Sequence, residues 1–155
     1  MPKVFVGPDR ISTEIDAGAC AYDAVGDKAR QVVVARVNGE IVDLSHALQD
    51  GDAVEPVLIS EPEGLSVLRH SVAHIVAQAT QSVFEDVKLG IGPPIKDGFF
   101  YDFGTTRTFT PDDLVTIEKK CVEIINSGQK FSRRVTNREA ARTELSNEPF
   151  KIRLL

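Results

Sequence analysis

An apolar pattern with helical spacing, from about Ser66 to Asp86, restricts the fold of this chain more than any other stretch. Apolar residues recur three and four positions apart, which places them on one stripe of a helix: Leu68, Val72, Ile75, Val76, Ala79 and Val83. His70 and His74 stand in the same pattern, and at about 100° per residue they project from the opposite side. The sequence therefore predicts a long helix with two imidazoles away from its buried face.

The residues around the two histidines favour a cleft. Where a solvated helix face would usually carry Lys and Glu, short or neutral residues share the histidine side: Ser66, Ala73, Ala77 and Gln81. We expect them to leave room for a ligand. The alternative is that the pair is exposed and has no chemical role, which is the commoner case for isolated histidines at this spacing.

Two histidines four residues apart on a helix can also hold a divalent metal. The metalloprotease motif needs a glutamate directly after the first histidine, and Ser71 stands there, which excludes a protease of that type. Cys20 and Cys121 show no paired spacing, so we expect reduced thiols, with Cys121 in a core, and no metal site. A metal-dependent deacylase remains an alternative, which stoichiometric zinc in the purified protein would reveal.

Length and composition are those of a soluble globular protein. The 155 residues suffice for one ordinary domain or two small ones, with 42% hydrophobic and 26% charged residues. No apolar run approaches the ~20 residues that span a bilayer, and the first residues lack the apolar segment of a signal peptide. We expect a cytoplasmic protein without a membrane partner.

Charge is unevenly distributed along the chain. Residues 1–62 hold 5 Lys and Arg against 11 Asp and Glu, whereas residues 63–155 hold 13 against 12. The first part is therefore a poor match for a phosphate backbone. A basic cluster in the second part is a candidate for RNA contact, with a solvated mixed surface as the alternative: Lys130, Arg133, Arg134, Arg138 and Arg142.

The first 60 residues predict a small domain of two hairpins, a helix between them and a closing strand. Asn38-Gly39 is the strongest local signal, because this dipeptide tolerates the positive φ angles of a type I′ turn between two strands. The expected elements are strands at 3–6, 11–15, 31–37, 40–44 and 53–59, a short helix at 19–26 and a helical turn at 45–48.

The second part predicts further alternation of strands and helices. Thr110-Pro111 begins a helix that Gly128 ends, with an apolar stripe of Leu114, Ile117, Cys121, Ile124 and Ile125. Strands are expected at 88–91, 98–103, 131–135 and 150–155, a stiff loop at 92–97, and a helix opened by Thr136 and Glu139 that runs to Leu145. In the strand at 98–103, Phe99, Tyr101 and Phe103 point to one side.

Residues 36–57 resemble the second half of a TGS domain, a ubiquitin-like β-grasp module of threonyl-tRNA synthetases, certain GTPases and stringent-response enzymes. The polar stretch Ser60–Gly64 then reads as a linker. We accordingly expect a TGS domain at residues 1–62 and a second domain at 63–155.

Three motifs follow in the same order and spacing as in the editing domain of bacterial threonyl-tRNA synthetases: residues 68–74, 88–95 and 97–103. The chain is thereby identified as resembling the amino-terminal region of that family. The resemblance implies an α+β fold class, with a β-grasp TGS domain followed by an editing domain of the threonyl/alanyl-tRNA synthetase type. The chain stops after Leu155 without a cap or turn, so we expect that domain to continue beyond it.

The family attaches threonine to its tRNA using ATP, and its editing domain hydrolyses serine misattached to the terminal adenosine. The resemblance implies that His70 and His74 hold the ester and a water, and that Tyr101 and Lys151 line the same pocket. The implied partner is the acceptor end of threonine-specific tRNA. A free-standing TGS module that docks protein or RNA without catalysis is the alternative, and it would not need the histidines.

The family's Cys-xxx-His element and its zinc-bearing, ATP- and magnesium-using core would lie beyond Leu155. We therefore expect no cofactor in residues 1–155, and neither charging nor efficient editing by these residues alone. Full-length relatives dimerise through their catalytic cores, so we expect a monomer here.

Overall fold

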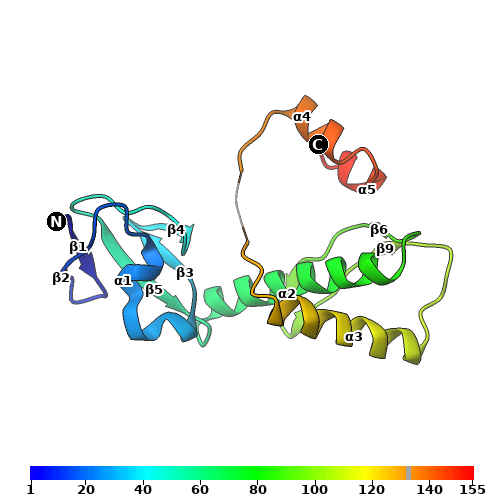
Figure 1. Cartoon of the computed structure of the whole chain (residues 1–155), viewed down its shortest axis with the longest axis horizontal. Helices are drawn as coiled ribbons and strands as arrows, with labels where there is room; N and C mark the ends of the chain where they lie inside the picture. Colours follow the sequence, from blue (N-terminus) through cyan, green and yellow to red (C-terminus); the bar gives the residue numbers. More distant parts are fainter. Residues whose placement is uncertain (132–133) are drawn as a thin grey trace. The chain divides into compact units, whose positions relative to one another are not determined.

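The structure is a computed structural model that describes residues 1–131 and 134–155, except for the side chains of residues 27–29. It divides into two compact units, Met1–Leu68 and Arg69–Leu155 (Figure 1).

The first unit is built on a five-stranded mixed sheet in the order β2-β1-β5-β3-β4. The strands are β1 (Lys3–Val6), β2 (Ile11–Glu14), β3 (Val32–Val37), β4 (Glu40–Asp43) and β5 (Ala53–Leu58). β1 runs parallel to β5, and the other neighbours are antiparallel. α1 (Ala21–Val25) and the 3₁₀ helix η1 (Gly26–Gln31) connect β2 to β3. The predicted arrangement of two hairpins with a helix between them and a closing strand is confirmed.

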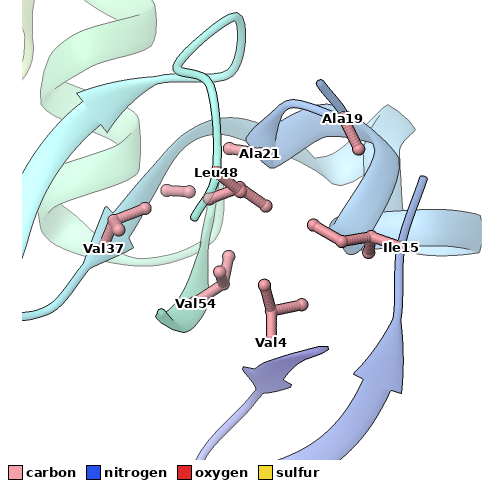
Figure 2. Close-up of a cluster of buried hydrophobic side chains, with 8 residues drawn as sticks. Val4, Ile15, Ala19, Ala21, Val37, Leu48 and Val54 are labelled. Carbon is pink, nitrogen blue, oxygen red and sulfur yellow. The ribbon is translucent and has the colours of Figure 1, made fainter. Parts of the chain in front are cut away.

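The core of this unit gathers small and β-branched side chains from the sheet and from the chain around α1 (Figure 2). Its buried members are Val4, Ile15, Ala19, Ala21, Ala35, Val37, Leu48 and Val54. β3 is flanked by β5 and β4, and it is mostly buried because a strand inside a sheet has neighbours on both edges. A register shift between Val32 and Val34 puts an irregularity in its pairing with β5.

The turn between β3 and β4 has the conformation that its dipeptide predicts. Asn38 and Gly39 have φ angles of 51° and 90°, as a type I′ turn requires. The Asn38 side chain donates to Asp52 Oδ1 at 2.7 Å and accepts from the Ala53 N–H at 3.0 Å. This residue therefore ties the hairpin to the start of β5.

The helical turn predicted at 45–48 is wrong. Ala47 forms a β-bridge with Cys20, and the Leu48 N–H donates to the Ala19 carbonyl at 3.0 Å. The backbone groups of this segment pair with the chain in front of α1, which satisfies them without a helix.

α2 (Pro62–Val83) is the long helix that the apolar pattern predicts, but it begins inside the stretch interpreted as a linker. Pro62 occupies its first position, where a missing N–H costs nothing. Glu63 pairs with Arg36 at 2.6 Å. Gly64 packs so tightly that a Cβ there would lie 2.1 Å from the Leu58 oxygen. The first turn of α2 is thereby held by the first unit, while its later turns belong to the second.

The strands of the second unit are shorter than predicted. β6 (Lys88–Leu89) pairs with β9 (Phe103–Gly104), and β7 (Pro94–Ile95) pairs with β8 (Gly98–Phe99). The strand expected at 98–103 is thus broken in two, and part of the expected loop at 92–97 folds back as β7. The predicted alternation nevertheless persists, because Phe99, Tyr101 and Phe103 are half-buried while Phe100 is exposed.

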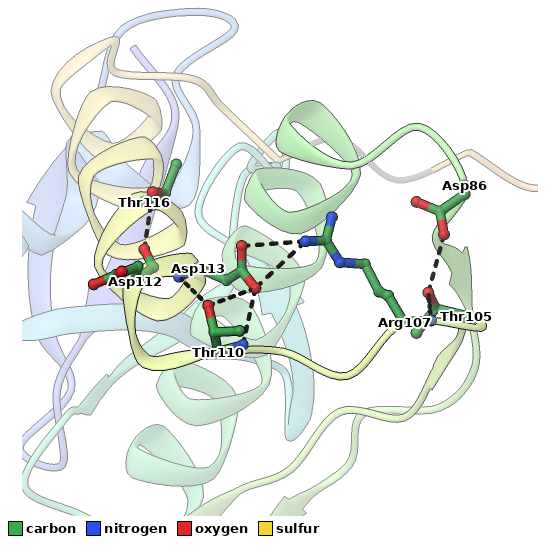
Figure 3. A network of polar contacts seen from close by, with 7 residues as sticks. All are labelled: Asp86, Thr105, Arg107, Thr110, Asp112, Asp113 and Thr116. Atoms are coloured by element: carbon green, nitrogen blue, oxygen red, sulfur yellow. Dashed lines mark hydrogen bonds and ion pairs between the residues drawn. The ribbon is translucent and has the colours of Figure 1, made fainter.

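α3 (Pro111–Asn126) begins at the predicted N-cap, Thr110 (Figure 3). The Thr110 hydroxyl accepts from the Asp113 N–H at 3.3 Å, and the Asp113 carboxylate accepts from the Thr110 N–H at 2.8 Å. Arg107 pairs with Asp113 at 3.3 Å. The expected apolar stripe of α3 is buried only at Ile117, whereas Leu114 and Ile125 are more than half exposed and Cys121 is half-buried.

The final segments differ most from expectation. α4 (Arg138–Glu144) is capped by Asn137, whose side chain accepts from the Ala140 N–H, and not by Thr136. The strand predicted at 150–155 is wrong, because Pro149–Ile152 form the helix α5 with proline at its first position. In the strand predicted at 131–135, the described residues Phe131, Arg134 and Val135 are irregular, and positions 132–133 lie outside the described residues.

Candidate functional site

α2 places the two histidines in direct contact. The Nε2 atoms of His70 and His74 are 2.8 Å apart, and the ring centroids are separated by 4.7 Å. A hydrogen bond between two ring nitrogens needs a proton on one of them and a lone pair on the other. The two exposed imidazoles therefore share one proton along this contact while the second nitrogen acts as acceptor.

The surroundings of His74 favour its neutral form. Partial loss of hydration lowers the pKa of His74, and the charges of His70 and Lys151 lower it further. A depressed pKa leaves the ring uncharged at neutral pH, where it can accept a proton. His74 is accordingly suited to a basic role.

Two recesses lie beside His74. One of about 210 Å³ is lined by His74, Ile75, Gln78, Ile124, Ile125, Gln129, Lys130 and Phe131. A wider and shallower one of about 500 Å³ is lined by His74, Ala77, Gln78, Gln81, Ser82, Leu89 and Phe131. Gln78 lines both recesses, and its side chain donates to the Gln129 side chain at 3.0 Å. A ligand at His74 would thus meet a mainly apolar hollow on one side and a more open one on the other.

The expected free space lies beside Ala77 and Gln81, which line the wider recess, but not beside Ala73, which lines neither recess. Ala73 and Ala77 are 0% and 2% exposed, and Thr80 is also fully buried. In the stripe predicted to face the core, Ala79 is fully buried, but the larger residues are only half-buried: Leu68, Val72, Ile75, Val76 and Val83. The covered seam of α2 is made mainly of its smallest residues, because these let neighbouring segments approach most closely.

Tyr101 lies in the segment between β8 and β9. Its ring stacks on Phe103 with a centroid distance of 4.9 Å. Among the residues that the structure describes, its buried hydroxyl oxygen has no hydrogen-bond partner. Burial raises the pKa of Tyr101, and the nearby Glu148 charge raises it further, so the phenol keeps its proton. A buried donor without a partner costs about 1–3 kcal/mol, a penalty that a ligand oxygen would relieve.

Lys151 reaches the same region from α5. Its Nζ atom is 5.8 Å from the centre of the Tyr101 ring, and its charge is one of the causes of the low pKa of His74. The sequence placed Lys151 in a strand, yet the structure brings it next to Tyr101 from a helix. All four predicted residues therefore lie in the second unit and form two pairs. His70 contacts His74, and Lys151 lies near Tyr101.

Arg69 is a positioning residue that the sequence did not single out. Its guanidinium donates to the carbonyls of Ile95 at 3.2 Å and Lys96 at 2.6 Å, which fastens the turn between β7 and β8 to α2. The only available signal was its position beside His70 in the first motif. Its partners are backbone carbonyls, which leave no pattern in the sequence.

The other candidate groups give no second centre. Among the side chains that the structure describes, which leave out residues 27–29 and 132–133, no three His, Cys, Asp or Glu are grouped to hold a metal, and Cys20 and Cys121 are free thiols. Of the basic cluster, Lys130 lines the smaller recess and Arg134 pairs with Glu144, while Arg133 lies outside the described residues. None of the described helices is long and apolar enough to cross a membrane.

Comparison with known proteins gives both a domain and a set of relatives. Residues 2–57 match the TGS domain family. The chain is 60% identical to a threonine-tRNA ligase of Streptomyces griseus over 126 residues, which are 81% of this chain and 19% of that protein. It is 58% identical to the ligase of Streptomyces avermitilis over 95% of this chain and 22% of that protein. For Thermobifida fusca the identity is 51%, over 97% of this chain and 22% of the relative. The chain spans about a fifth of the length of these relatives.

Proposed function

From the premise that this chain carries a TGS domain and is a homologue of threonine-tRNA ligases over most of its length, we propose a function. The proposed function is a part in the editing of mischarged tRNA. In this proposal residues 63–155 begin an editing domain that receives the acceptor end of threonine-specific tRNA. The reaction is hydrolysis of the ester that joins serine to the terminal adenosine. Attachment of threonine using ATP is the proposed activity of the protein as a whole.

Discrimination between threonine and serine supplies the physical reason for such a site. Serine lacks one methyl group, and a difference of that size is worth about 1–3 kcal/mol, or roughly 10- to 200-fold in selectivity. A synthetic site alone therefore releases some seryl-tRNA, which a second site must hydrolyse.

The contact between His70 and His74 beside an open recess is the observation that carries the proposal. In the proposed reaction a water oxygen attacks the ester carbonyl carbon, and the neutral His74 ring takes a proton from that water. The bond from the carbonyl carbon to the ribose oxygen then breaks, and the ribose oxygen receives a proton. The products are free serine and tRNA with a free ribose hydroxyl.

Tyr101 and Lys151 have binding roles in this proposal. The Tyr101 hydroxyl, which keeps its proton, donates to an oxygen of the bound aminoacyl adenosine and gains the partner that it lacks among the described residues. The Lys151 ammonium offers a positive charge to the phosphate of the terminal nucleotide. Both groups orient the ester toward His74 without taking part in bond breaking.

The test uses a hydrolysis-resistant probe that keeps a phosphate, serine joined through an amide to 3′-amino-3′-deoxyadenosine 5′-monophosphate, titrated into the chain and followed by NMR. We expect chemical-shift changes around His74 and a dissociation constant about 30-fold weaker in the variant His70→Ala/His74→Ala, since each of the two lost polar contacts is worth about 1 kcal/mol. His46→Ala is the matched control, because this exposed histidine belongs to the first unit.

Two outcomes would contradict the editing proposal. One is equal binding of the probe by the double-histidine variant and the unaltered chain. The other is a set of chemical-shift changes confined to residues 2–57, which would favour a TGS docking module without catalysis. Stoichiometric zinc in the purified chain would instead support the metal-dependent alternative.

A further inference from the structure

We propose that Glu148 is a positioning residue that holds Lys151 at the candidate site by clamping the start of α5 to β6 and α2. This inference rests on the proposed function, because it concerns the same site. Glu148 touches neither histidine, and its effect is exerted through Lys151.

The clamp consists of two hydrogen bonds that join distant parts of the second unit. Glu148 Oε2 accepts from the Leu89 N–H at 2.7 Å, and Glu148 Oε1 accepts from the Gln81 side-chain amide at 2.6 Å. The same Gln81 amide donates to the Val87 carbonyl at 3.1 Å. Hydrogen bonds to an ionised carboxylate are stronger than those between neutral groups, so this is a firm anchor.

α5 needs an anchor because it is too short to be stable alone. It contains four residues, whereas isolated helices shorter than ~12 residues are marginal in water. Glu148 is its N-cap residue and Lys151 stands three positions later. The location of the Lys151 ammonium is therefore decided by the contacts that fix this turn.

Phe150 supplies a second, apolar anchor on the neighbouring strand. Its ring lies very close to Gly104 of β9: a Cβ added to Gly104 would be 2.2 Å from the Cε2 atom of Phe150. Glu148 thus fastens α5 to β6 while Phe150 packs on β9, and these two strands pair with each other. The Glu148 anchor also reaches α2, the helix that bears the histidines, through Gln81.

The partners of Glu148 also shape the space beside His74. Gln81 and Leu89 both line the larger recess, together with Ala77. Gln81 lies seven residues after His74, which is two helical turns along the same face of α2. The clamp therefore connects one wall of the recess to the segment that delivers Lys151.

The variant Glu148→Gln tests this role. It keeps the size of the side chain, but its amide nitrogen is itself a donor and cannot accept from the Leu89 N–H or from the Gln81 amide. The readout is the titration of the His74 ring by NMR. Lys151 lowers the pKa of His74, so releasing Lys151 should raise it. Simple loss of a negative charge would lower the pKa instead. The direction of the shift therefore separates positioning from a direct charge effect.

Two further variants define the pathway. Lys151→Met should raise the pKa of His74, and Glu148→Gln in that background should cause no further rise, because both changes remove the same interaction. Glu85→Gln removes an exposed carboxylate in the turn after α2 and should leave the titration unchanged. In the probe titration, Glu148→Gln should weaken binding by about 10-fold, as expected for loss of a hydrogen bond to a charged group.

A fall in the pKa of His74 in Glu148→Gln, or no change in a variant that NMR shows to be folded, would overturn the inference. If that variant does not fold, Gln81→Met removes one of the two bonds at similar volume, and the absence of a rise there overturns it equally. The titration needs no tRNA. Failure of the probe to bind the unaltered chain would therefore contradict the editing proposal and leave the coupling of Glu148, Lys151 and His74 to be judged separately.

Discussion

Gly92 faces the Tyr101 ring at a distance that leaves no room for a side chain. A Cβ at residue 92 would lie 2.1 Å from Tyr101 Cδ2 and 2.4 Å from Cε2, whereas ordinary contact begins at 3.4 Å. In Gly92→Ala the ring must therefore move by about 1.3 Å, or the backbone must yield by a similar amount. Gly92 is not among the glycines with positive φ, so alanine brings no backbone strain of its own.

We expect Gly92→Ala to lower the free energy of unfolding of the second unit by about 1–3 kcal/mol, the usual cost of overpacking. The displaced ring would also lose part of its stacking on Phe103 and its approach to Lys151. The measurement is urea unfolding followed by NMR signals of second-unit amides, such as Leu89 and Asp102. A probe within this unit is needed because a chain of two units need not unfold in one step.

Tyr101→Ala provides the matched background, because it removes the ring that the new methyl group would strike. In that background Gly92→Ala should lower the free energy of unfolding by less than about 0.5 kcal/mol. Most of the cost of Gly92→Ala in the unaltered chain is then coupling energy between residues 92 and 101. An equal cost in both backgrounds would refute the reasoning, since it would show that the Tyr101 ring is not what excludes a side chain at residue 92.

Three other predictions concern local signals in the sequence. Thr110→Ala should destabilise α3 by about 0.5–2 kcal/mol by urea unfolding, while Thr110→Ser, which keeps the capping oxygen, should not. The Thr110 N–H, followed by its hydroxyl, lowers the pKa of Asp113 in the folded chain, so the stabilisation is present above the unfolded pKa and is lost as pH falls through the folded value. The protection of amides in the first turn of α3, measured relative to their intrinsic exchange rates, should therefore fall as the pH drops below the ordinary aspartate pKa of 3.8, and Asp113→Asn should lose this dependence. Asn38→Ala should lower the free energy of unfolding by about 1–3 kcal/mol, because it removes two hydrogen bonds and leaves alanine at a positive φ. Asn38→Gly removes the same bonds without φ strain, so an equal loss in both variants would show that φ strain contributes nothing.

Local patterns in the sequence predicted the elements whose cause is local. The Asn38-Gly39 turn needs only residues that tolerate positive φ, and the start of α3 needs only a capping hydroxyl followed by proline and carboxylates. The spacing of apolar residues likewise predicted α2 and placed His70 and His74 on one side of it, and the structure adds that the two rings touch.

The arrangement of the site was decided by tertiary contacts. Residues 150–155 were expected as a strand, and the anchors that fix α5 instead are Glu148 on Leu89 and Phe150 on Gly104. These anchors join positions 59 and 46 residues apart. The burial of Ala73 and Ala77 depends in the same way on what approaches α2 rather than on its own pattern.

By itself, the sequence determined the turn at Asn38-Gly39, the start of α3 and that two imidazoles share one helix face, because backbone preference and helical periodicity act over a few residues. Only the tertiary structure decided that Lys151 approaches Tyr101 and that its charge acts on His74. Those relations depend on hydrogen bonds and packing between segments far apart in the chain, and no short stretch of sequence encodes them.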